Sequence, residues 1–129
     1  MSKISRDDIK KKGIRRTLRT FKYSWQGLAY AYKNEQSMWV HAIASVVTIA
    51  LGFIFSLSLT EWAIVLISLG VILASELINT AIEAAVDLCT LEINPLAKIA
   101  KDCGSASTFV LTICAVIVCL FVFVPHFIG

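Results

Sequence analysis

Three long apolar runs, at residues 38–59, 62–88 and 104–128, constrain this chain more than any other feature. Each run reaches the length of about 20 residues that an α-helix needs to cross the hydrocarbon core of a bilayer. A segment in lipid satisfies its backbone groups as a helix, because an isolated strand would leave them unpaired. With 57% hydrophobic residues and a mean hydropathy of +0.77, the sequence predicts an all-α integral membrane protein. We expect its 129 residues to form a single domain with three transmembrane helices and no separate soluble domain.

The basic residues indicate how these spans are oriented. All 12 Lys and Arg residues either precede the first run or lie between the second and third, at Lys98 and Lys101. Positively charged segments next to spans stay in the cytoplasm. We therefore expect residues 1–37 and a loop at 89–103 to be cytoplasmic, and the turn near 58–61 and the C-terminus to be extracytoplasmic. Such a distribution suits anionic headgroups or phosphates, whereas nucleic acid is a poor partner for so apolar a chain.

The segment before the first run has a helical apolar pattern of its own. Its large side chains recur at steps of three and four residues, which confines them to a stripe roughly 80° wide on a helix. Trp and Tyr within the stripe favour a helix lying in the membrane interface, and an ordinary packed cytoplasmic helix is the alternative. The stripe consists of Ile14, Leu18, Phe21, Trp25, Leu28 and Tyr32.

The second apolar run ends in a polar stripe. Glu76, Asn79, Glu83 and Asp87 fall on one helical face less than about 90° wide, and the stripe is roughly 16 Å long at the helical rise. A charge at the bilayer centre costs about 2.5–3.5 kcal/mol on insertion scales, so these groups are expected to have a function. They could relay protons, bind a cation or form an enzyme site, and contacts between helices are the simpler alternative.

A second polar cluster, AKDCGSAS at residues 100–107, stands at the end of the expected cytoplasmic loop. The small residues at 104–107 are expected to let neighbouring helices approach closely. Asn94 and Pro95 resemble a helix start, with Asn as the cap and Pro at the first helical position. Lys101 would then lie at the same membrane face as Glu83 and Asp87. Carboxylates for a metal beside a lysine for phosphate suggest a bound nucleotide, although the phosphate-binding loop and the motifs of soluble kinases are absent from the sequence.

Four stretches together resemble the small bacterial membrane lipid kinases, the prokaryotic diacylglycerol kinase and undecaprenol kinase family. They are YSWQGL at 23–28, NE at 34–35, ELINTAIEAAVD at 76–87 and AKDCGSA at 100–106. The resemblance covers most of the chain from about residue 15. It implies a homotrimer in the bacterial inner or plasma membrane, with an amphipathic N-terminal helix and three spans per protomer. It also implies transfer of the γ-phosphoryl group of ATP to a lipid hydroxyl at the cytoplasmic interface, with Mg²⁺ as cofactor.

The same resemblance implies roles for single residues. Glu76 corresponds to the general base, and Glu35 and Glu83 correspond to ligands of the nucleotide-bound Mg²⁺. Asn79 matches a polar partner beside the base. Further nucleotide contacts are implied at Arg16, Tyr23, Glu92, Lys101 and Asp102, and supporting or lipid-facing roles at Trp25, His41, Asp87 and Ser105.

Two residues depart from the family pattern. His41 stands where diacylglycerol-specific members have a carboxylate, and Asn94 stands where many Gram-positive relatives have His. The first departure favours undecaprenol as the acceptor, with undecaprenyl phosphate as the product, and diacylglycerol is the alternative acceptor. From the residues alone, His41 is either a polar member of the site or a headgroup contact. A proton- or cation-conducting oligomer without enzymatic activity is the alternative from a different functional class.

The charge distribution predicts the membrane topology. A reporter enzyme fused after Gly129 should be extracytoplasmic, and one inserted near Glu92 should be cytoplasmic, because the basic residues flank only the cytoplasmic ends of the spans. Activity of paired reporters that work on opposite sides of the membrane measures this. A cytoplasmic C-terminus would contradict the span count or the orientation.

Overall fold

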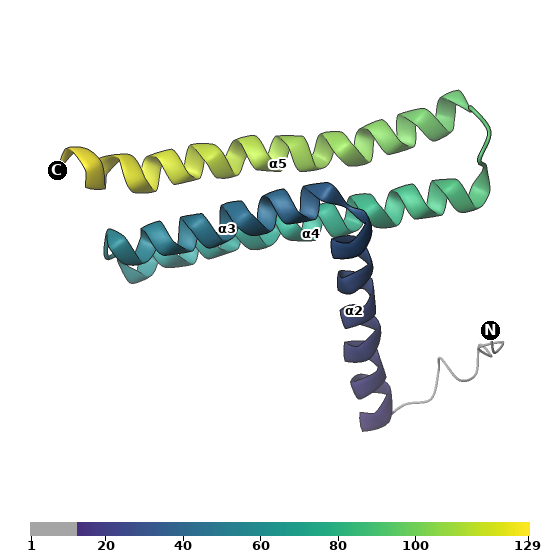
Figure 1. The fold of residues 1–129 in the computed structure, drawn as a ribbon, viewed down its shortest axis with the longest axis horizontal. Coiled ribbons are helices and arrows are strands. Elements are labelled where there is room, and N and C mark those ends of the chain that lie inside the picture. The colour runs from purple at the N-terminus through teal and green to yellow at the C-terminus, as the bar shows by residue number, and fades with distance from the viewer. Residues whose placement is uncertain (1–12) are drawn as a thin grey trace. The chain divides into compact units, whose positions relative to one another are not determined.

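The computed structural model describes residues 13–129, and this part of the chain is helical with no strand (Figure 1). The helices are α2 (Ile14–Asn34), α3 (Gln36–Ile54), α4 (Leu59–Cys89) and α5 (Pro95–Ile128). The last three are long and apolar enough to cross a membrane, which confirms the predicted all-α membrane fold. The chain divides into two compact units, one ending at Asn34 and the other comprising Glu35–Gly129.

Helix α2 has the amphipathic character that the apolar stripe predicts. Ile14, Leu18, Phe21 and Trp25 on the stripe are all exposed, as expected for side chains that would enter the headgroup region of a bilayer. The helix itself is confirmed, and its place at the interface stays a prediction. Five basic residues of the expected cytoplasmic segment lie outside the described residues: Lys3, Arg6, Lys10, Lys11 and Lys12.

The turn between α3 and α4 comes earlier than the sequence predicts. Helix α3 ends at Ile54, although the apolar run continues to residue 59, and Ser56 adopts a left-handed φ of 53°. Helix α4 then starts with a capping box, in which Ser58 and Glu61 each bond the backbone N–H of the other. Capping therefore sets the helix start, and Glu61 lies in the first turn of α4 rather than in the connecting turn.

At the other end of α4, only residues 90–94 connect it to α5. The side chain of Asn94 accepts hydrogen bonds from the backbone N–H groups of Leu96 and Ala97, and Pro95 occupies the first turn. This confirms the predicted helix start. It also corrects the expected loop at 89–103, since residues 95–103 already belong to α5.

Helix α4 packs against both α3 and α5 (Figure 1). The core, near the α3–α4 turn, is formed by Leu57, Val65, Leu69, Val122 and Phe123. At the same end, Nε2 of His126 lies 2.9 Å from Oε1 of Glu61, which joins the last turn of α5 to the first turn of α4. His126 is thus a contact between helices.

Gly52 permits the close packing of α3 on α4. A Cβ atom at this position would lie 2.7 Å from Cη2 and 2.9 Å from Cζ2 of Trp62. The indole ring also packs against Phe53, with ring centroids 4.9 Å apart. Because the ring is rigid and also in contact with Phe53, it has little freedom to move away.

We predict that Gly52→Ala destabilises the protein, since overpacking costs about 1–3 kcal/mol. Gly70→Ala is the matched control, because a Cβ at position 70 meets nothing within 4 Å in the chain. There Ala should leave stability unchanged or raise it by about 1 kcal/mol through helix propensity. The midpoint of thermal aggregation in one detergent measures both, and equal midpoints would contradict the packing argument.

Candidate functional site

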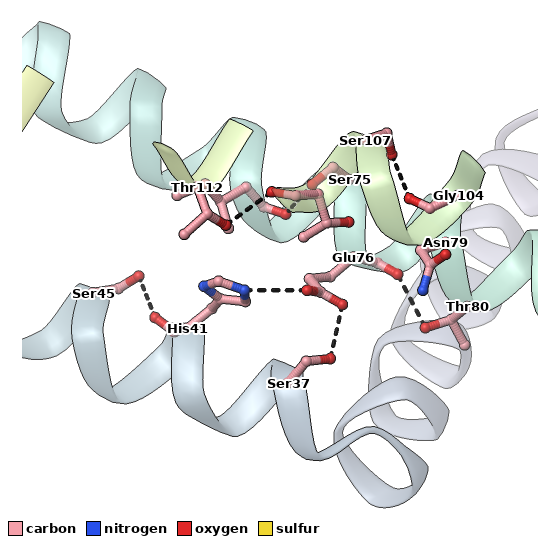
Figure 2. Close-up of polar contacts among 12 residues, drawn as sticks. Ser37, His41, Ser45, Ser75, Glu76, Asn79, Thr80, Gly104, Ser107 and Thr112 are labelled. Carbon is pink, nitrogen blue, oxygen red and sulfur yellow. Dashed lines mark hydrogen bonds and ion pairs between the residues drawn. The ribbon is translucent and has the colours of Figure 1, made fainter. Parts of the chain in front are cut away.

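Glu76 is the buried centre of the polar stripe, with 5% of its surface exposed. Two side chains of α3 point at its carboxylate (Figure 2). The hydroxyl of Ser37 donates to Oε2 at 2.8 Å, and Nε2 of His41 lies 3.1 Å from Oε1. A buried carboxylate is costly unless it is paired and hydrogen-bonded. Both oxygens of Glu76 therefore have a partner, and both partners come from the neighbouring helix.

The contact with Glu76 favours His41 as a polar member of the predicted site, and its role there stays a prediction. The side chain of His41 is only 15% exposed, which argues against a headgroup contact as its main role. Ser37 was not among the residues that sequence reasoning selected. A signal for it existed, because residues 37 and 41 are one helical turn apart and share a face, so a polar pair could have been recognised at the start of the first apolar run.

Asn79, which the resemblance implies as a polar partner beside Glu76, bonds to the next carboxylate of the stripe. Its side-chain amide donates to Oε1 of Glu83 at 3.0 Å. The two residues are four apart on α4 and therefore neighbours on the helix surface. Asn79 thus orients Glu83, and its own oxygen Oδ1 is buried without a hydrogen-bond partner.

Gly104 of α5 makes room for this amide. A Cβ at position 104 would lie 2.5 Å from Oδ1 of Asn79. The small residues after Asp102 were expected to permit a close approach of neighbouring helices, and Gly104 does so at the polar stripe. Ser105, next to it, is exposed on α5.

Glu35 has an unusual position at the start of α3. It is the N-cap residue, yet its side chain makes no capping hydrogen bond, although residues that occupy N-caps normally do so. The carboxylate of Glu35 is half-buried, as is that of Glu83. Glu35 therefore supplies a carboxylate that the helix itself does not use.

Within residues 13–129, no three His, Cys, Asp or Glu side chains gather as a metal site. Mg²⁺, however, commonly keeps several waters and binds through one or two carboxylates together with substrate phosphates. Hard oxygen donors such as Glu35 and Glu83 suit that ion, and Glu83 is already oriented by Asn79. The donor chemistry thus fits a nucleotide-bound Mg²⁺ rather than a closed metal cage.

Two ion pairs lie near the connection between α4 and α5. Nζ of Lys101 donates to Oδ1 of Asp87 at 2.6 Å, and Lys98 pairs with Asp102 one turn further along α5. The pair of Lys101 and Asp87 places Lys101 at the end of the stripe predicted for it. Both pairs are well exposed, so each contributes little stability and leaves its charges accessible to a ligand.

The remaining predicted site residues are not brought to Glu76 by a described contact. Arg16, Tyr23 and Trp25 lie on α2, in the other unit, and their roles stay predictions. Glu92 is exposed in the connection at residues 90–94.

The stripe therefore has two ends with different chemistry. Glu76 is buried and held by donors, which suits a proton acceptor, while Glu83, Asp87 and Lys101 are more exposed and suit a cation and phosphates. The rise of α4 separates Glu76 from Glu83 by roughly 10 Å along the helix axis. Such an arrangement can bind a phosphate compound at one end and accept a proton from a membrane-embedded group at the other.

Comparison with known proteins matches the sequence to one family. The sequence model described as prokaryotic diacylglycerol kinase matches residues 22–123. An undecaprenol kinase of Bacillus subtilis is 34% identical over 112 residues, covering 87% of this chain and 91% of the relative. A diacylglycerol kinase of Pseudomonas aeruginosa is 39% identical over 98 residues, covering 76% and 80%. One of Escherichia coli is 30% identical over 115 residues, covering 89% and 94%.

Proposed function

The chain belongs to the prokaryotic diacylglycerol kinase family and is a membrane lipid kinase that uses ATP, and from this premise we propose that it phosphorylates undecaprenol with Glu76 as general base. The observation that carries the proposal is the buried carboxylate of Glu76 between two donors of α3. Each carboxylate oxygen has about two lone-pair directions. Ser37 and His41 each use one, so the carboxylate keeps capacity to accept the proton of a lipid hydroxyl.

The nucleotide is proposed to bind at the more exposed end of the stripe. Glu35 and Glu83 would hold the Mg²⁺ of Mg-ATP, with Asn79 orienting Glu83. When bound there, Mg²⁺ would neutralise charge on the phosphates, as phosphoryl transfer requires. Lys101 offers a further positive charge to the phosphates. It is paired with Asp87 and would leave this exposed ion pair to bind them. The remaining proposed nucleotide contacts are Arg16, Tyr23, Glu92 and Asp102.

Placement in the membrane supports this division of roles. With the cytoplasm at the 90–94 connection, ATP would reach Glu83 and Lys101 from water, while Glu76 would lie deeper, where a lipid hydroxyl can reach it. We propose the membrane orientation that the distribution of basic residues indicates. We also propose the homotrimer that the resemblance implies. Neighbouring protomers could then complete a nucleotide site for which one chain supplies few carboxylates.

His41 supports undecaprenol as the acceptor. Relatives named for either acceptor are of similar identity, so overall similarity does not decide between them. At position 41 the diacylglycerol-specific members have a carboxylate, which can accept a hydrogen bond from a lipid. His41 instead faces Glu76, which leaves one proton acceptor at this point of the site. An acceptor whose sole polar group is one hydroxyl matches that arrangement.

We predict that substitutions of the three proposed site carboxylates impair different steps of the reaction. Glu76→Gln should abolish turnover and leave Mg-ATP affinity largely intact, because the amide keeps the size of the side chain but cannot take the proton. Glu83→Gln and Glu35→Gln should weaken Mg-ATP binding, with partial rescue at high Mg²⁺. Nucleotide affinity and turnover are measured separately on each purified and folded variant.

Asp87→Asn is the control for charge loss on the same helical face. Its partner Lys101 is half exposed, so this variant should lose less activity than the other three. Near-normal turnover of Glu76→Gln would refute the general base. Loss of Mg-ATP binding in that variant alone would exchange the roles of Glu76 and Glu83.

The acceptor is tested by direct competition. Undecaprenol and diacylglycerol at equal mole fraction in one detergent mixture should both be available to the enzyme, and we predict faster labelling of undecaprenol from radiolabelled Mg-ATP. His41→Glu should shift the ratio toward diacylglycerol. Preferential labelling of diacylglycerol by the unsubstituted enzyme would overturn the acceptor and leave the lipid kinase unchanged, whereas no Mg²⁺-dependent lipid product would refute the proposed cofactor.

A further inference from the structure

Ser37 uses its hydroxyl differently from the other hydroxyl side chains of its helix. Ser45 and Thr48 of α3 donate to the backbone carbonyl four residues earlier, at His41 and Ala44. This local bond is the common solution for Ser and Thr within helices. Ser37 lies in the first turn of α3, where no carbonyl of α3 exists four residues before it. Its hydroxyl instead reaches α4 and donates to Oε2 of Glu76 at 2.8 Å.

We infer that Ser37 is a positioning residue for the general base, an inference that rests on the role proposed for Glu76. The terminal torsion of a glutamate side chain is broad and poorly defined. One donor fixes one oxygen and leaves the carboxylate free to rotate about it. Ser37 on Oε2 and His41 on Oε1 together fix both oxygens, and therefore the plane of the carboxylate.

The position of Ser37 also couples the two ends of the site. Glu35 is the N-cap residue of α3, and Ser37 is the second residue of the helix. Only one residue separates them in the chain, so their backbones lie close together. The start of α3 thus presents a carboxylate proposed for the nucleotide end and a hydroxyl that orients the base. Ser37 fixes the position of the Glu76 carboxylate relative to the bound nucleotide. The same lipid hydroxyl can then give its proton to Glu76 and receive the phosphoryl group.

The test is the kinetics of Ser37→Ala. Its kcat should fall by about ten- to a hundredfold, the range in which small misplacements of a catalytic group act. The KM for Mg-ATP and the KM for the lipid should not change, because the hydroxyl of Ser37 is already bonded to Glu76. The loss should be equal with undecaprenol and with diacylglycerol, since it acts through the base. Ser37→Thr keeps the hydroxyl and should restore kcat.

Ser45→Ala is the matched control, because it removes a serine hydroxyl from the same helix without touching Glu76. It should keep the kcat of the unsubstituted enzyme. A Ser37→Ala variant with normal kcat, or one that loses no more than Ser45→Ala, would overturn the inference. So would a loss that appears in KM alone.

The result of Glu76→Gln separates the two proposals. An inactive Glu76→Gln enzyme with a normal Ser37→Ala enzyme refutes the positioning role and leaves the base in place. An active Glu76→Gln enzyme refutes the base itself, whatever Ser37→Ala does. If Ser37→Thr does not fold, the comparison of Ser37→Ala with Ser45→Ala still decides the question.

Discussion

The burial of the Glu76 carboxylate is the constraint on which the arrangement of this protein depends. A charge within a membrane-spanning helix is costly, and Glu76 is nearly inaccessible within the chain. Its cost is offset because α3 supplies two donors, Ser37 and His41. The site therefore requires α3 and α4 to pack in one register, since a shift of one residue would move both donors away. The packing of α3 against α4 thus also sets the contacts of the Glu76 carboxylate.

Different kinds of contact hold α3, α4 and α5 together at their two ends. At the end near the α3–α4 turn, apolar packing dominates, with Gly52 against Trp62 and Phe55 against Phe127 at a centroid distance of 4.5 Å. The pair of Glu61 and His126 adds one polar contact between α4 and α5 there. At the other end, Gly104 lets α5 approach Asn79, and the charged pairs are exposed. Apolar contacts thus dominate one end, and exposed charged pairs dominate the other.

The sequence predicted the polar face of α4 because helical periodicity is local information. Glu76, Asn79, Glu83 and Asp87 share a face by spacing alone, and the cap at Asn94 was recognisable from residue types. The partners could not be obtained in this way. Asn79 bonds to Glu83 rather than to Glu76, and Ser37 is 39 positions from the carboxylate it contacts. The early end of α3 was also missed, because hydropathy does not distinguish an apolar turn from an apolar helix.

The sequence by itself determined the number of membrane helices, the polar face of the second one and the amphipathic first helix. Each of these follows from the length, composition or period of one segment, and needs no knowledge of what lies beside it. The tertiary structure decided which side chains meet: that His41 and Ser37 hold Glu76, that Asn79 serves Glu83, and that Gly104 makes room for that amide. These contacts depend on the register between helices, which is set by the packing of many side chains along their whole length, and no single segment contains that information.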